Sequence, residues 1–112
     1  MPSPQIVESA MPIEMKRYPF TRPVIEYAPH DVGGVYVLWD GNEAIYIGRT
    51  GGAHNIRACL LEHLDGTRVD CTRTATHYSW EITIWDSARE TELLALFARE
   101  NRRDPRCQQK LA

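Results

Sequence analysis

The stretch GVYVLWDGNEAIYIGRT, residues 34–50, decides the fold because it predicts a β-hairpin. Residues 34–39 and 44–49 are rich in β-branched and aromatic side chains, which favour strands. Between them, Asp40-Gly41-Asn42 has the composition of a tight turn. The stretch therefore predicts two antiparallel strands joined by a three-residue loop.

The length of this loop determines which side chains share a face of the hairpin. With the three-residue loop, Trp39 faces Glu43, and by the same count Tyr36 faces Tyr46. A two-residue turn would shift the pairing by one residue and put the two tyrosines on opposite faces. We expect the two phenol rings to lie side by side on one face.

The rest of the chain is expected to continue as helix, strand and helix. Residues 54–64 carry apolar side chains at helical spacing, and Asp65-Gly66 would end that helix. Residues 76–85 alternate like a third strand, and a second helix is expected from Ser87 to about Arg103. This order predicts an α+β fold with a three-stranded antiparallel sheet and flanking helices.

The first 33 residues are less regular than the rest. Their six prolines interrupt any long helix. Residues 1–12 are expected to form a mobile tail, and residues 13–33 an extended arm whose apolar side chains could lie over a core. Residues 34–112 form the single predicted domain.

Composition and charge limit the classes of function. A chain of 112 residues fits one domain, and a net charge of -2 with a pI of about 6.1 excludes a polycation. Any nucleic-acid contact must then come from a local basic patch. No apolar run approaches the roughly 20 residues of a membrane span, and a secretory signal is not recognisable. Three irregularly spaced cysteines favour reduced thiols in a cytoplasmic protein.

Gly34-Val35-Tyr36 and Tyr46-Ile47-Gly48, with nine residues between the two tyrosines, resemble the name motif of the GIY-YIG nuclease family. The resemblance covers about residues 33–108. It implies a three-stranded antiparallel sheet with packed helices, in the order predicted above. It also implies metal-dependent hydrolysis of phosphodiester bonds in a nucleic acid, with DNA as the first substrate to consider.

In that family two tyrosines, an arginine on the first helix and a glutamate on the next helix form one site. By resemblance, Tyr36 and Tyr46 are the two tyrosines, and a tyrosine assists proton transfer. Gly48 would let the chain pass close to a ligand, and Arg49 would contact a phosphate. The implied cofactor is a single Mg²⁺ or Mn²⁺, since a carboxylate is a hard ligand that suits these ions.

The first predicted helix departs from the family's pattern, which is Asn-Leu-x-x-Arg-Leu-x-x-His. The chain matches it at four positions: Asn55, Ile56, Leu60 and His63. The position of the arginine holds Cys59. One turn later, His63 could share proton transfer as a neutral imidazole, or it could be an ordinary surface histidine.

Arg57 is the arginine nearest to the vacant position. Two residues turn a helix by about 200°, so Arg57 would face away from Cys59 once the apolar stripe fixes the helix's rotation. Arg57 remains a candidate substrate contact by proximity in sequence. Arg49, or Arg22 from the arm, could supply the missing charge instead.

Glu90-Thr91-Glu92-Leu93-Leu94 fits the family's second-helix pattern with Glu90 as the metal ligand and Glu92 as the second choice. Glu90 also follows Ser87 by three residues, which is the spacing of a helix capping box. Near the C-terminus, Gln108 stands where the family has an asparagine after Pro105, and its amide could contact substrate.

Two other interpretations use the same residues. Cys59, His63, Cys71 and His77 could bind zinc, although their spacing matches no common zinc signature. Alternatively, the domain keeps the fold without the chemistry and binds a nucleic acid or a protein partner. The cysteine at the arginine position and the acidic pI favour that alternative, whereas the tyrosines, His63 and Glu90 favour the nuclease.

Overall fold

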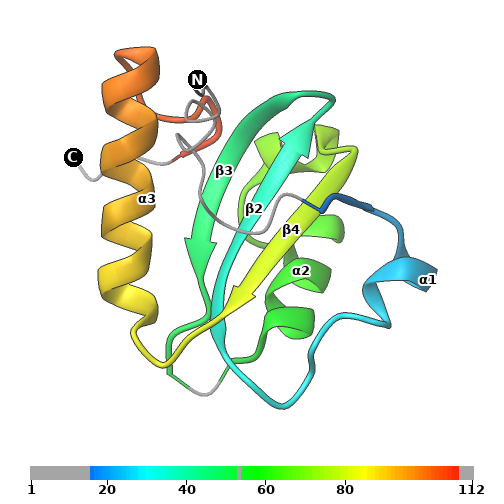
Figure 1. Cartoon of the computed structure of the whole chain (residues 1–112). Helices are drawn as coiled ribbons and strands as arrows, with labels where there is room; N and C mark the ends of the chain where they lie inside the picture. The colour runs from blue at the N-terminus through cyan, green and yellow to red at the C-terminus, as the bar shows by residue number, and fades with distance from the viewer. Residues whose placement is uncertain (1–15, 53, 109–112) are drawn as a thin grey trace, which may run out of the picture.

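The computed structural model describes residues 16–52 and 54–108, which form one four-stranded antiparallel sheet with helices on both faces (Figure 1). The strand order is β1-β4-β2-β3. In chain order the elements are β1 (Tyr18–Pro19), α1 (Arg22–Ile25), β2 (Gly34–Asp40), β3 (Glu43–Arg49), α2 (Ile56–Leu64), the 3-10 helix η2 (Asp70–Thr74), β4 (His77–Ile82) and α3 (Asp86–Asn101). The α+β class and the antiparallel sheet are confirmed. The tail predicted for residues 1–12 lies outside the described residues.

The predicted count of three strands is wrong, because the arm contributes β1 to the sheet. Tyr18 pairs with Tyr78 and Pro19 with His77, at the free edge of β4. A proline cannot donate to the ladder, but a short edge strand tolerates it. The chain then forms α1, in which Ile25 is fully buried. The prolines that predicted only an extended arm therefore concealed both a strand and a helix.

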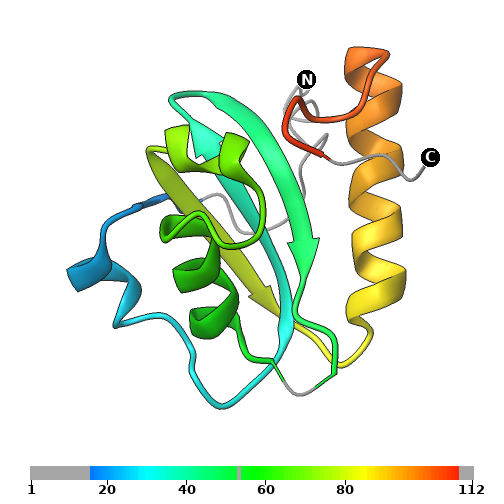
Figure 2. The same cartoon turned by 180° about the vertical axis from the view of Figure 1, so that it is seen from behind.

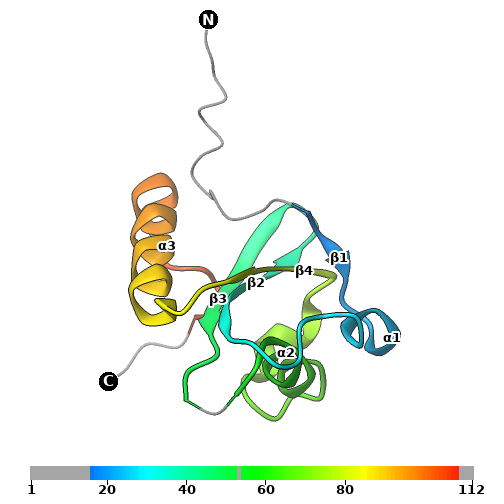
Figure 3. The same ribbon diagram turned by 60° about the horizontal axis from the view of Figure 1, so that its bottom comes forward.

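β2 is covered on both of its faces. Tyr36 and Leu38 point into a core shared with α1 and α2, whereas Val35 and Val37 point into a core beneath α3. Figure 3 shows α3 on one side of the sheet and α1 and α2 on the other. The two-residue period of a strand thus places Tyr36 in the layer of α2.

The β2–β3 hairpin closes with a two-residue turn, so the predicted three-residue loop is wrong. Asp40 pairs with Glu43, and Gly41 in the turn has a positive φ of 62°. Glycine adopts this conformation without a steric penalty. At this end of the hairpin Trp39 pairs with Ala44. Continued unchanged, that register would put the two tyrosines on opposite faces.

A β-bulge at Ile45 restores the shared face of the tyrosines. After the bulge Leu38 pairs with Tyr46 and Tyr36 with Gly48, so Ile45 is the extra residue of β3. Ile45 and Tyr46 consequently both pack against the core of α2. The rings of Tyr36 and Tyr46 stack with their centroids 6.1 Å apart. The predicted shared face is confirmed, although a bulge produces it and the two tyrosines are not directly paired.

The two motif glycines are required by close packing. A Cβ built on Gly34 would lie 2.0 Å from the backbone oxygen of Glu81 on β4. A Cβ on Gly48 would lie 2.6 Å from the Oη atom of Tyr36. Gly34 therefore allows β2 to approach β4, and Gly48 makes room for the first tyrosine.

We expect Gly34→Ala to lower the free energy of unfolding by about 3 kcal/mol, because the added methyl group meets backbone that cannot rotate away. Gly52→Ala is the matched control, since a Cβ there meets nothing within 4 Å and the residue has no positive φ. It should change stability by less than about 0.5 kcal/mol. Urea denaturation of both variants measures the difference, and equal midpoints would contradict the steric account.

The helices begin and end close to the predicted positions. Asn55 caps α2 by accepting a hydrogen bond from the backbone N–H of Ala58 at 2.9 Å. α3 begins at Asp86, one residue before the predicted start, and Arg102 ends it in the left-handed conformation. The third predicted strand stops at Ile82, so it is shorter than residues 76–85.

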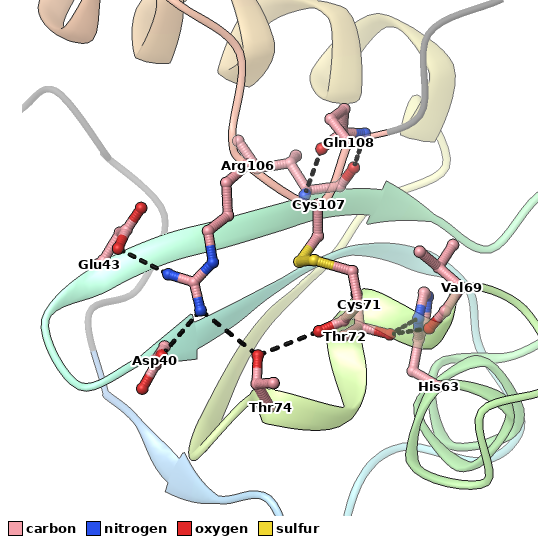
Figure 4. The surroundings of a disulfide bond; sticks show 11 residues. Asp40, Glu43, His63, Val69, Cys71, Thr72, Thr74, Arg106, Cys107 and Gln108 are labelled. Atoms are coloured by element: carbon pink, nitrogen blue, oxygen red, sulfur yellow. Dashed lines mark hydrogen bonds and ion pairs between the residues drawn. A yellow bond between two sulfur atoms is a disulfide. The ribbon is translucent and has the colours of Figure 1, made fainter.

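Cys71 and Cys107 form a disulfide bond, so the prediction of three reduced thiols is wrong (Figure 4). The bond joins η2 to the segment after α3. The third cysteine, Cys59, is free and fully buried on α2. Since disulfides persist mainly in oxidising compartments, the pair removes the observation on which the cytoplasmic prediction rested.

Candidate functional site

A buried chain of hydrogen bonds links β2, α2 and η2. The Oη atom of Tyr36 lies 2.9 Å from Nε2 of His63, and Nδ1 of His63 lies 2.9 Å from Oγ1 of Thr72. The hydroxyl of Thr72 donates to the carbonyl oxygen of Val69 at 2.8 Å. Figure 4 shows the part of this chain from His63 to Val69. His63 is fully buried, so its interpretation as a surface helix histidine is wrong.

The hydrogen-bond chain determines the tautomer of His63. Thr72 has one hydroxyl hydrogen and gives it to Val69, so its oxygen must accept from Nδ1–H of the imidazole. The Nε2 atom then accepts from the phenol O–H of Tyr36. Burial, with a smaller effect of Arg68, lowers the pKa of His63 from 6.5 to about 4. The imidazole is therefore neutral at pH 7.

This low pKa predicts a loss of stability in mild acid. As the pH falls below 6.5, the unfolded chain takes up a proton at His63 before the native state does, so the free energy of unfolding falls until about pH 4. The pKa difference corresponds to about 3 kcal/mol. Urea denaturation at several pH values between 7.5 and 4 gives the free energy of unfolding as a function of pH. This free energy should fall less steeply with falling pH for His63→Gln than for the wild type. The exposed His30→Gln variant is the control, and equal slopes for wild type and His63→Gln would contradict the assignment.

Tyr46 lies between the buried chain and the solvent. Its ring centroid is 4.6 Å from that of His63, and partial burial raises its pKa. Its side chain lines a cavity of about 780 Å³ beside β3. β3 is an edge strand of the sheet, and Figure 2 shows it between the layers of α2 and α3. Tyr36, by contrast, is fully buried, and burial raises its pKa well above 10.0. Tyr46 is therefore the tyrosine that an incoming ligand would meet.

Arg49 and Glu90 line the same cavity from β3 and α3. The Nε atom of Arg49 lies 3.5 Å from Oε1 of Glu90, and its Nη1 atom lies 3.8 Å from Oδ2 of Asp86. Partial burial, with a smaller effect of Asp86, raises the pKa of Glu90 although Arg49 opposes it. Glu92 is more exposed and pairs with Arg89 at 2.8 Å. Glu90, not Glu92, thus faces the cavity.

The capping box predicted for Ser87 and Glu90 is wrong. The helix begins one residue earlier, with Trp85 in the N-cap position and no side-chain cap hydrogen bond. The carboxylate of Glu90 is therefore not used to cap its own helix.

Arg68, like Glu62, is a cavity residue that the sequence did not reveal. Its Nη1 atom donates to the Oη atom of Tyr36 at 3.0 Å, and its Nε atom pairs with Glu62 at 2.9 Å. It follows α2, where Gly66 adopts a positive φ of 74° and the chain reverses. The side chain lines the cavity together with Tyr46. No periodic pattern marks such a residue, because its position depends on the path of a loop.

Three other candidates lie apart from this cavity. The Nη2 atom of Arg57 donates to the carbonyl oxygen of Glu26 on the arm side of α2. Gln108 bonds both the backbone N–H and the carbonyl oxygen of Ile47, at 3.0 and 2.8 Å, and so holds the C-terminal segment on β3. Arg22 pairs with Asp65. The structure thus gives each of them a contact within the protein.

The zinc interpretation is wrong, because Cys71 is bonded to Cys107 and is not a free thiolate. Over residues 16–52 and 54–108, no group of three or more histidine, cysteine or acidic side chains is placed to hold a metal ion.

Among residues 16–52 and 54–108, none of the helices is both long and apolar enough to cross a membrane.

Comparison with known families found no family model that matches the chain, and no curated protein matches it either.

Proposed function

We propose that this chain is a GIY-YIG-type domain that hydrolyses phosphodiester bonds in nucleic acid with the help of Mg²⁺ or Mn²⁺. The observation that carries the proposal is one cavity whose lining includes Tyr46, Arg49, Arg68 and Glu90, together with Glu62 and His54. A hydroxyl, two guanidinium groups and a carboxylate are the groups that phosphodiester hydrolysis needs, since negative charge gathers on the phosphate in the transition state.

The charge of the lining distinguishes this cavity from its neighbour. A second cavity of about 570 Å³ shares the loop of residues 50–52, but its described lining carries Asp31 and Asp86 and no arginine. The first cavity also carries two carboxylates, Glu62 and Glu90, but it has two arginines beside them, and guanidinium groups are the side chains that bind phosphate best. We therefore assign the scissile phosphate to the cavity that Arg49 and Arg68 line.

In this proposal Glu90 is the protein ligand of a magnesium or manganese ion. Mg²⁺ is usually held by one or two carboxylates while water and substrate phosphates complete its coordination. Glu90 would hold the ion, whereas Asp86, which lines the neighbouring cavity, only raises the pKa of Glu90. When bound, the ion would polarise the phosphate and stabilise the leaving oxygen.

The two tyrosines have different parts in the proposal. Burial keeps Tyr36 and His63 neutral, and their hydrogen bond fixes the Oη atom that accepts from Arg68. Tyr36 and His63 are then positioning residues. Tyr46 reaches the cavity and would orient the attacking water through its hydroxyl group.

One observation favours a second candidate, a binding module without chemistry. Ile84 and Trp85, between β4 and α3, are 84% and 70% exposed. Large apolar side chains that stay exposed together often belong to an interaction surface. On this interpretation the domain binds a protein partner or a nucleic acid.

Incubation with supercoiled plasmid, single-stranded DNA and RNA, each with Mg²⁺, Mn²⁺ or EDTA, tests the proposal. We expect cleavage in the presence of metal and none with EDTA, and Tyr46→Phe should reduce it. Binding of the same nucleic acids without cleavage under any metal condition would instead support the binding module. If the protein neither binds nor cleaves any of these nucleic acids, the nuclease proposal is refuted.

A further inference from the structure

Arg68 lies near Cys59, the position on α2 where the family pattern has an arginine. Cys59, on α2, is fully buried, and burial raises the pKa of its thiol. The thiol is thus neutral and cannot balance charge on a phosphate. The Nη1 atom of Arg68 lies 3.0 Å from the Oη atom of Tyr36, and the charge of Arg68 partly opposes the rise in the pKa values of both Tyr36 and Cys59.

The contacts of Arg68 hold its guanidinium group in one orientation. The Nη1 atom is bonded to the buried oxygen of Tyr36, and the Nε atom is paired with Glu62. Tyr36 itself is fixed by its hydrogen bond to His63. The side chain nevertheless keeps 32% of its surface exposed at the cavity. A group anchored on one edge and open on the other is suited to bind an anion.

We propose that Arg68 is the catalytic arginine of this domain, and that it supplies from the loop after α2 the charge that Cys59 cannot supply from the helix. This inference rests on the proposed function. The Nη2 edge of Arg68 binds a non-bridging oxygen of the scissile phosphate in the cavity that Glu90 also lines. Tyr36 and His63 serve to aim this guanidinium group.

Arg68→Ala tests the inference, with Arg73→Ala as the matched control. Arg73 lies in η2, a few residues after Arg68, but it is 60% exposed and forms an ion pair with Asp70 at 3.5 Å. We expect Arg68→Ala to lower kcat about 10²–10³-fold, as for other single groups that stabilise transition-state charge. Arg73→Ala should keep the wild-type kcat. Arg68→Lys should recover only part of the loss, because a lysine lacks the planar fork.

Restoring the charge from the helix separates a catalytic role from a structural one. We expect Cys59→Arg in the Arg68→Ala background to regain at least about 10-fold in kcat, since the new guanidinium group enters at the same site. Because a buried arginine can prevent folding, near-ultraviolet circular dichroism and thermal unfolding are recorded for each variant. If the double variant does not fold, the rescue is replaced by a binding measurement. NMR then compares the binding of the small phosphodiester bis(4-nitrophenyl) phosphate to the wild type, Arg68→Ala and Arg73→Ala.

The possible results distinguish this inference from the proposed function. If the wild type cleaves nucleic acid and a folded Arg68→Ala variant cleaves equally well, the inference is overturned and the nuclease stands. If the wild type cleaves nothing, the nuclease falls. In that case weaker binding of bis(4-nitrophenyl) phosphate to Arg68→Ala, but not to Arg73→Ala, still supports Arg68 as the anion-binding group, and unchanged binding refutes it.

Discussion

We expect Glu90→Gln to abolish metal-dependent cleavage and Glu92→Gln to leave it unchanged. Glu90 is the carboxylate of α3 that lines the cavity, and an amide binds a hard divalent ion far more weakly than a carboxylate does. The Lewis-acid contribution of a bound ion is several kcal/mol, so its loss should lower the rate by about 10³-fold or more. Single-turnover rates at saturating substrate measure this effect.

The two glutamates form a matched pair for this comparison. Both substitutions remove one negative charge from the same helix, but Glu92 is exposed and bound to Arg89. A titration with Mn²⁺ gives a second readout, since the concentration needed for half-maximal rate should rise in Glu90→Gln alone. Full activity of Glu90→Gln would show that another group holds the metal.

Removal of the disulfide has the largest expected effect on stability. Cys71 and Cys107 are separated by 36 residues, and the bond denies the unfolded chain the conformations in which these residues are far apart. For a loop of this length the loss of chain entropy corresponds to about 4 kcal/mol. The free energy of unfolding should fall by this amount when the protein is reduced, or when both cysteines are replaced by serine.

Urea denaturation with and without a phosphine reductant measures that fall. The double serine variant should be insensitive to the reductant, because it has no bond to break. Cys59→Ser is the control, since it removes the free thiol and should keep the full response to reduction. If the urea midpoint of the wild type does not change on reduction, the disulfide bond is absent or contributes nothing to the free energy of unfolding.

Local patterns predicted most of the fold, and features that depend on distant contacts escaped them. The alternation in residues 34–49 and the helical spacing in residues 54–64 are short-range signals, and the structure confirms both the hairpin and α2. The bulge at Ile45 leaves no such signal, because it matters only for which side chains meet α2. β1 was hidden for the same reason, since its strand character depends on pairing with β4.

The residues of the candidate site likewise fall into those that local patterns predicted and those that they did not. Tyr36, Tyr46 and Glu90 could be named from a motif, and the helix period places Glu90, although the bulge at Ile45 and not the strand period brings Tyr46 to the face of Tyr36. Arg68 could not be named, since it reaches the cavity through a turn at Gly66. Arg57 and Gln108 were named from sequence proximity or from the motif, and both instead contact backbone atoms of neighbouring segments.

The disulfide gives the chain a covalent topology that divides the cavity between two parts of the molecule. Residues 71–107 form a closed ring that contains β4 and α3, and the proposed metal ligand Glu90 belongs to that ring. Tyr46 and Arg68 belong to the open chain that precedes it. A cut in the exposed connection at Ile84 and Trp85 would therefore leave one molecule, with Glu90 still tethered to the rest through Cys107. The two halves of the cavity would separate only if the sulfur–sulfur bond were broken as well.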